Sequence, residues 1–297
     1  MMRIDPKEIP TGKLHGLMLG TIGPRPIAFA STVDKTGNVN LSPFSFFNVF
    51  SANPPILVFS PARRVRDNTT KHTLENAIET KEVVINIVSY DIVEQMSLTS
   101  TEYAQGVNEF VKSGLTAVDS EMVKPPRVGE SIAAYECKVN EVISLGDEGG
   151  AGNLIICEVV LMHLKEEILN EQGMPDPVKA DLVGRMGADW YCRANGEALF
   201  ELPKPNKNLG IGYDQIPEII RNSVVLSGNN LGRLGNIEKL PDPEAVSAFG
   251  TRPEIEEVKL RFKNDPESLE YHLHTMAQDF LRSDELENAW LTLLQVN

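Results

Sequence analysis

Residues 23–32 read Gly23-Pro24-Arg25-Pro26-Ile27-Ala28-Phe29-Ala30-Ser31-Thr32, an apolar run that enters through two prolines and ends in two hydroxyls. Such a run, bounded by turn residues, is typical of a β-strand. The residues that follow, Asp34-Lys35-Thr36-Gly37-Asn38, are of the types that favour a tight turn. The sequence therefore predicts a hairpin directly after the first strand.

Short apolar runs separated by turn residues continue to about Leu164, which is the pattern of a barrel or a sandwich. In residues 135–143 apolar and charged side chains mostly alternate, so one face of that strand is expected to meet water. Short helices fit at Thr73–Thr80 and Asp91–Leu98. We predict a mainly β fold with added helices, whose strands include Pro26–Val33, Ile56–Ser60, Val83–Val88, Tyr135–Leu145 and Leu154–Leu164.

The pattern changes to helical signals after Pro203-Lys204-Pro205. Asp242-Pro243 and Asp265-Pro266 each place a capping side chain before a proline at the first helical position, and Thr251-x-x-Glu254 fits a capping box. We predict a first domain of residues 1–202 and a helical C-terminal extension of residues 203–297. The last two helices carry apolar stripes typical of packing surfaces, made of Leu269, Leu273, Met276 and Phe280, and of Leu286, Ala289, Trp290, Leu293 and Leu294.

The composition excludes two classes of partner. The 297 residues include 28 Lys and Arg against 42 Asp and Glu, and the resulting charge of −14 repels nucleic acid and the anionic face of a membrane. No apolar run approaches the roughly 18 residues that a membrane span needs, and the N-terminus lacks the apolar core of a signal peptide. We expect a cytoplasmic protein in which Cys137, Cys157 and Cys192 are reduced.

Two segments are candidates for a ligand site. Residues 40–48, Asn40-Leu41-Ser42-Pro43-Phe44-Ser45-Phe46-Phe47-Asn48, mix small polar and aromatic side chains in an expected loop, as a planar heterocycle with polar edges requires. They could equally be a turn whose Phe side chains enter the core. The loop of residues 146–153 holds four glycines and is either a plain hairpin connection or a close approach to a ligand.

A third segment, residues 63–73, is the densest positive cluster in the acidic chain. It reads Arg63-Arg64-Val65-Arg66-Asp67-Asn68-Thr69-Thr70-Lys71-His72-Thr73 and leads into an expected helix. Helix N-terminal N–H groups, hydroxyls and cations together bind phosphate. The segment is therefore a candidate phosphate site, with a solvated basic loop as the alternative.

Taken in order, these motifs resemble the flavin reductase-like, FMN-binding split β-barrel family. The resemblance covers residues 15 to 195, about three-fifths of the chain. It is carried by Arg25-Pro26-Ile27-Ala28 leading to Ser31-Thr32, by Asn40-x-Ser42-Pro43-Phe44-Ser45-x-Phe47, by Lys71-x-Thr73-Leu74-x-Asn76 before the strand at 83–88, and by Gly184-Arg185-Met186-Gly187-x-Asp189-Trp190-Tyr191.

The resemblance implies a homodimer of split barrels that holds FMN at the subunit interface. Thr32, Ser42, Phe44 and Ser45, with Pro43 in the same motif, would border the isoalloxazine, Arg63, Asn68, Thr69, Lys71 and Thr73 would be phosphate candidates, and Arg185 and Trp190 would reach the flavin. The chain departs from the family in two places. Many relatives carry a histidine in the loop that here reads Gly149-Gly150-Ala151-Gly152-Asn153, and the stretch 66–73 is longer than the family's compact Lys-Asp-Thr form.

The function that the resemblance implies is an FMN-dependent oxidoreductase, in which NAD(P)H delivers hydride to flavin N5 and a small-molecule or protein acceptor takes the electrons. No acid–base side chain is obligatory for such a reaction, so no catalytic residue is named. Two alternatives remain: an FMN-bound electron carrier without NAD(P)H activity, and an interaction protein that uses the barrel as a scaffold. The five scattered histidines indicate no metal site, and the sequence carries no dinucleotide-binding G-x-G-x-x-G after a strand and no hydrolase motif.

Overall fold

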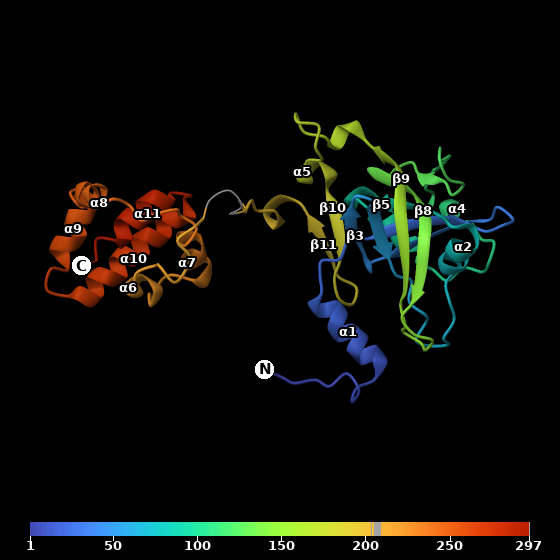
Figure 1. Ribbon diagram of the computed structural model, residues 1–297, viewed down its shortest axis with the longest axis horizontal. Helices are drawn as coiled ribbons and strands as arrows, with labels where there is room; N and C mark the ends of the chain where they lie inside the picture. The colour runs from blue at the N-terminus through green and yellow to red at the C-terminus, as the bar shows by residue number, and fades with distance from the viewer. Residues whose placement is uncertain (203, 205–208, 297) are drawn as a thin grey trace. The chain divides into compact units, whose positions relative to one another are not determined.

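A seven-stranded antiparallel sheet is the centre of the N-terminal half (Figure 1). The computed structural model describes residues 1–202, 204 and 209–296, which divide into two units, Met1–Phe200 and Glu201–Asn297. The strand order is β2-β1-β5-β8-β9-β4-β3. The strands are β1 (Ala28–Val33), β2 (Val39–Phe44), β3 (Phe47–Ala52), β4 (Pro55–Phe59), β5 (Glu82–Ile87), β8 (Ala133–Ser144) and β9 (Asn153–Leu164), so the five predicted strands are confirmed to within two residues at either end.

Helices cover both faces of this sheet. Leu74 and Ala77 of α2 (His72–Thr80) pack with β1, β5, β8 and β9 in one core, while Phe29 and Leu41 point to the other face and meet Met96 of α3 (Val93–Leu98). β1 is buried along its whole length because it lies between these two layers. The remaining elements of the unit are α1 (Thr11–Thr21), α4 (Glu109–Ser113), α5 (Pro177–Ala180), the pair β6 (Ala117–Val118) and β7 (Arg127–Val128), and the pair β10 (Leu182–Arg185) and β11 (Tyr191–Ala194).

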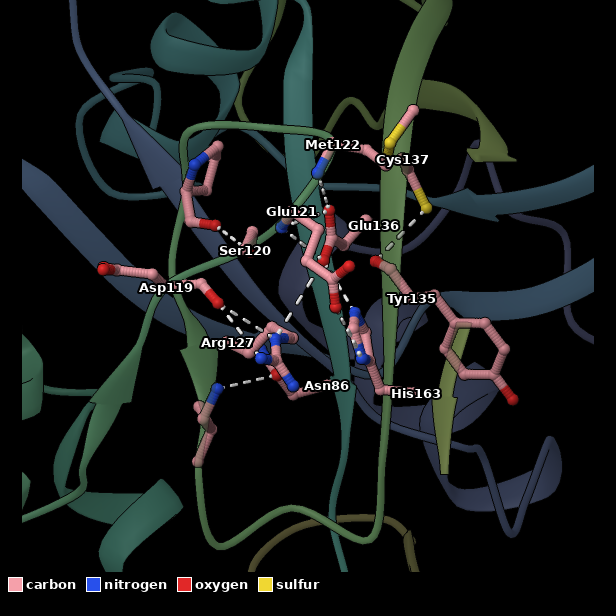
Figure 2. A network of polar contacts seen from close by, with 12 residues as sticks. Asn86, Asp119, Ser120, Glu121, Met122, Arg127, Tyr135, Glu136, Cys137 and His163 are labelled. Carbon is pink, nitrogen blue, oxygen red and sulfur yellow. Dashed lines mark hydrogen bonds and ion pairs between the residues drawn. The ribbon is translucent and has the colours of Figure 1, made fainter. Parts of the chain in front are cut away.

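A buried carboxylate fastens the segment between β6 and β7 to the sheet (Figure 2). Glu136 of β8 is fully buried and accepts hydrogen bonds from the backbone N–H groups of Glu121 and Met122, and it lies 2.7 Å from Nε2 of His163 on β9. Burial alone would raise the pKa of Glu136, but these donors outweigh it and lower that pKa. The network therefore holds an ionised carboxylate inside the unit.

The C-terminal unit is built from helices, as the sequence predicts (Figure 1, orange to red). Trp290 and Leu273 are buried in its core, and the indole N–H of Trp290 donates to the carbonyl oxygen of Leu234 at 3.2 Å. The predicted apolar stripes of the last two helices are confirmed as packing surfaces. The helices are α6 (Glu218–Arg221), α7 (Gly228–Leu234), α8 (Pro243–Phe249), α9 (Pro253–Arg261), α10 (Pro266–Arg282) and α11 (Leu286–Leu293).

Three local predictions are wrong. Asp242 is the N-cap residue of α8, but its side chain caps no backbone N–H group. The segment 40–48 is not a loop, because its residues form most of β2 and the start of β3, joined by a tight connection. Thr251 does not begin a capping box, because α9 starts one residue later than that pattern requires, after Arg252, and the Thr251 hydroxyl donates to the Ala248 carbonyl instead. The helical pattern is predicted to begin after Pro203-Lys204-Pro205, and both of these prolines lie outside the described residues. Within the described ranges, no helix has both the length and the apolar character to cross a membrane.

Candidate functional site

A polar cavity lies beside the N-terminus of α2. Within the described chain, the backbone N–H groups of His72 and Thr73 have no hydrogen-bond acceptor and no side chain caps the helix. An open helix N-terminus carries partial positive charge and favours an anion. The cavity is lined by Asn40, Ser42, Arg64, Lys71, His72, Thr73, Thr99, Ser100, Thr101, Glu102, Tyr103 and Glu109.

Lys71 is the available cation of this cavity. Its Nζ lies 5.0 Å from the centroid of the Phe44 ring, and it forms no ion pair or hydrogen bond with any of the other described residues. Burial and the neighbouring charge of Arg64 lower the pKa of Lys71. A bound anion would supply the partner that this ammonium group lacks. Thr73, which is buried beside it, accepts a hydrogen bond from Asn40 Nδ2 at 2.8 Å.

Two carboxylates share the cavity with Lys71. Glu109 is buried and accepts from the backbone N–H of Leu41 at 3.0 Å, and its burial raises the pKa of its carboxyl group. Glu102 pairs with Arg64 at 3.0 Å and with Arg66 at 2.9 Å. Arg66 also pairs with Asp67 at 3.1 Å, so Glu102 and Asp67 together meet the charges of the two arginines. Lys71 is then the positive charge of the described lining that forms no ion pair.

The loop between β4 and α2 is held by its own side chains. Arg63 Nε donates to Asn68 Oδ1 at 2.6 Å, and Asn68 Nδ2 donates to the carbonyl oxygen of Asp147 in the glycine loop at 2.9 Å. The hydroxyl of Thr69 donates to Asp67. The glycine loop packs closely here, since a Cβ on Gly149 would lie 3.0 Å from the Arg64 carbonyl oxygen. Arg63, Asn68 and Thr69 therefore shape the loop and are not among the residues that line the cavity.

A second group of predicted residues gathers where β2 ends. The hydroxyl of Ser45 accepts a 3.4 Å hydrogen bond from Nε of the buried Arg25. In the hairpin of β10 and β11, Arg185 stacks over the ring of Tyr191 and donates to the carbonyl oxygen of Trp190. Trp190 itself is 75% exposed. The second group thus offers hydroxyl, guanidinium and indole groups near one end of β2.

Known proteins resemble this chain in sequence and in structure. Residues 21–178, more than half of the chain, match the flavin reductase like domain. The chain belongs to this family. A relative in Aquifex aeolicus, an uncharacterized protein, is 40% identical over 196 residues, which are 66% of this chain and 97% of that protein.

Two solved structures are similar to this flavin reductase-like chain. Nitrilotriacetate monooxygenase component B from Bacillus cereus is 32% identical with a TM-score of 0.63, over 68% of this chain and 98% of that one. A flavin reductase-type protein with a split barrel domain from Shewanella frigidimarina is 28% identical with a TM-score of 0.57, over 69% of this chain and 100% of that one. The predicted fold, a split β-barrel followed by helices, is confirmed, and the family places the chain among flavin-linked oxidoreductases.

Only some of the residues that the sequence assigns to the flavin lie at the cavity. Ser42, Lys71 and Thr73 line the cavity, and Phe44 lies beneath Lys71. Thr32 lies elsewhere, since it is fully buried under α2 with its hydroxyl accepting from Asn76 Nδ2. Pro43 pairs with Phe29 in the ladder of β1 and β2 and is half-buried.

Sequence reasoning missed several residues of the cavity. Arg64 and Asn40 belong to motifs that were singled out, so the charge cluster and the Asn-x-Ser-Pro pattern could have indicated them. The turn of residues 99–103 and Glu109 come from a part of the chain without a motif, and only the folding of α3 and α4 onto β2 brings them to the cavity.

Proposed function

We propose that this flavin reductase-like protein is an FMN-dependent oxidoreductase that takes electrons from NAD(P)H and passes them to a small-molecule or protein acceptor. The observation that carries the proposal is the ammonium group of Lys71, which forms no ion pair with any described residue, beside the open N-terminus of α2. Both features suit a phosphate monoester, which FMN carries at the end of its ribityl chain. They therefore support FMN as the flavin.

The residues of the site would divide the work by position. Lys71, Thr73 and the first N–H groups of α2 would bind the phosphate, while Ser42 and Ser45 would offer hydroxyls to the polar edge of the ring. Arg63, Asn68 and Thr69 would act indirectly by fixing the loop that carries Lys71. When bound, the flavin supplies the redox chemistry by accepting a hydride and releasing electrons singly or in pairs. The protein orients it and excludes water.

The assembly is proposed to be a homodimer. β3 is an edge strand of the sheet, and its Val49 and Phe50 side chains are 63% and 69% exposed. An exposed edge with large apolar side chains is costly in water and is usually covered. We also propose that the protein works in the cytoplasm, because its three cysteines are free thiols.

A spectroscopic experiment tests the function. The purified chain is loaded with FMN, desalted, and titrated anaerobically with NADH and NADPH while the flavin absorption is followed. Retained flavin bands that bleach rapidly support the reductase. Retained bands that do not bleach indicate an electron carrier, and a chain that binds no flavin in a direct titration contradicts the proposal and favours a scaffold.

Two variants test where the phosphate binds. Lys71→Met removes a charge-assisted contact, so we expect FMN to bind about tenfold more weakly while riboflavin, which has no phosphate, binds as before. Glu102→Gln removes the anion that competes for Arg64 and Arg66, so FMN should bind about threefold more tightly. Glu148→Gln, which removes an equal charge from the glycine loop, is the control. Equal effects on FMN and riboflavin would place the phosphate elsewhere.

A further inference from the structure

Arg25 is a buried cation whose hydrogen bonds go only to uncharged oxygens. The residue is 6% exposed. Its guanidinium donates to the carbonyl oxygens of Leu19 (2.8 Å), Ile22 and Met186 (2.7 Å) and to the hydroxyl of Ser45 (3.4 Å). No carboxylate of the described residues forms an ion pair with it. Its positive charge is therefore solvated by dipoles but not neutralised.

These bonds join three segments that are far apart in the sequence. Leu19 and Ile22 belong to the end of α1, Ser45 follows β2, and Met186 lies in the turn between β10 and β11. The backbones of Arg25 and Arg185 also exchange two hydrogen bonds, of 3.0 and 2.8 Å. The packing is tight, since a Cβ on Gly187 would lie 2.8 Å from the Cα of Gly20. The guanidinium is thus held at a fixed place behind Ser45.

The local electrostatics work against this arrangement unless an anion is present nearby. Burial lowers the pKa of Arg25, and the adjacent charge of Arg185 lowers it further. Leaving a charge inside a protein without a counter-charge is unfavourable. Because no carboxylate of the described chain forms an ion pair with either of these two neighbouring arginines, they form a positive region that is suited to a negatively charged ligand group.

We infer that Arg25 is a positioning residue that fixes Ser45 and the turn of residues 186–190, and that its permanent positive charge, beside Ser45, would act on the ring of a flavin that Ser45 borders. This inference rests on the proposed function. The charge stabilises the negative charge that a flavin ring gains on reduction, because a fixed charge in a dry site needs no reorganisation during the reaction. Arg25 itself does not touch the reacting atoms. Its effect is to make the bound flavin easier to reduce.

The test compares two variants that disturb the same contacts and differ in charge. Arg25→Gln loses the charge, whereas Arg25→Lys keeps it. The midpoint potential of the bound FMN is measured by equilibrium reduction against an indicator dye. For Arg25→Gln we expect reduced FMN to lose about tenfold more affinity than oxidised FMN, which moves the potential about 30 mV to the negative side. For Arg25→Lys the potential should stay close to that of the parent protein.

Further variants keep the test decisive. The control is Arg193→Gln in the hairpin of β10 and β11, where the guanidinium of Arg193 pairs with Asp181 at 2.6 Å. This variant changes the net charge by the same amount as Arg25→Gln and should leave the potential unchanged. Arg185→Gln, whose side chain is half-buried, should move the potential in the same direction as Arg25→Gln and replaces it if that variant does not fold. Equal potentials in Arg25→Gln and Arg25→Lys, with FMN bound, would overturn the inference and leave the function standing. A parent protein that binds no flavin would overturn both.

Discussion

Single buried charges in the N-terminal unit are held in two different ways. Glu136 lies among donors, with a His ring and two backbone N–H groups directed at its carboxylate. The half-buried Lys71 and the buried Arg25 form no ion pair with any of the described residues. The first arrangement stabilises the fold, because a buried carboxylate with all its donors in place favours one conformation. The second arrangement suits a ligand, because it leaves positive charge to be satisfied from outside.

Glu136→Gln should lower the stability of the unit. The amide replaces an ionised acceptor and leaves a donor of the network unmatched, so we expect a loss of about 1–3 kcal/mol in the free energy of unfolding at pH 7, measured by urea denaturation. The pKa of Glu136 is lower in the folded protein. The advantage of the parent protein over the variant is therefore complete above the unfolded pKa of about 4.3, and it is lost as the pH falls through the lower folded pKa.

A nearby carboxylate provides the control for this prediction. The side chain of Glu121 is 68% exposed, and its carboxylate meets the network only at 4.0 Å from Nδ1 of His163, while its backbone N–H donates to Glu136. Glu121→Gln should therefore change the stability by less than about 0.5 kcal/mol. Equal losses in the two variants would show that the buried position of Glu136 has no special role.

At the scale of residues, the sequence predicts which chemical groups the site contains better than it predicts which residues line the cavity. Lys71 and Thr73 could be predicted because Lys71 directly precedes α2 and Thr73 lies in its first turn. A cation and a hydroxyl at the start of a helix can be recognised from neighbouring residues alone. Thr32 could not be excluded, since only the position of Asn76 on α2 shows that its hydroxyl is already used. The sequence indicates Arg25 only as part of a strand entry, because its hydrogen-bond partners lie in segments that the sequence does not connect.

At the scale of elements, strands with a clear apolar run or alternation were predictable, whereas β2 and β3, which mix small polar and aromatic residues, were not. In β8 and β9 the apolar residues alternate with polar ones or form a continuous run, and the predicted ends of both strands lie within two residues of the observed ends. β3 is half-buried or exposed at every position, so its residues show no period of two. α1 buries no side chain and contains Gly12, Gly16 and Gly20, and therefore gives no helical pattern.

Ser227→Ala should weaken the C-terminal unit more than Thr251→Ala. The capping box of this unit lies at α7, where the Ser227 hydroxyl accepts from the backbone N–H of Asn230 and the Asn230 side chain accepts from Ser227 N. Losing such a cap costs about 1 kcal/mol. Thr251 caps no helix, so its replacement should cost less than half as much. The fluorescence of the buried Trp290, followed in urea with Trp190 replaced by Phe, reports the unfolding of this unit.

At the scale of the whole molecule, the exposed edge strand predicts how copies associate. Phe50→Asp places a charge on β3 and should convert a dimer into a monomer, as measured by light scattering coupled to gel filtration. The control is Leu260→Asp on α9, a side chain that is 76% exposed in the other unit. A variant at Phe50 that remains dimeric would exclude the β3 edge as the interface.

The division into two units predicts the outcome of a truncation. Each unit has its own buried clusters, so a chain that ends at Phe200 should fold and bind FMN within about threefold of the full chain. Aggregation of the truncated chain, or loss of FMN binding, would contradict this. Unchanged turnover with NAD(P)H as well would show that the helical extension takes no part in the reaction.

The register of the sheet also bears on how quickly the barrel forms. The strands of the pairs β1–β2 and β8–β9 are joined by short connections, so each pair can form as a local hairpin that starts from its turn, such as Asp34–Asn38. The pair β4–β9, which aligns Ile56 with Glu158, must bring together residues about a hundred positions apart. Contacts of such high sequence separation slow folding, because the entropy of closing the intervening loop is lost before they form. We therefore expect closure of the barrel, rather than growth of its hairpins, to set the folding rate.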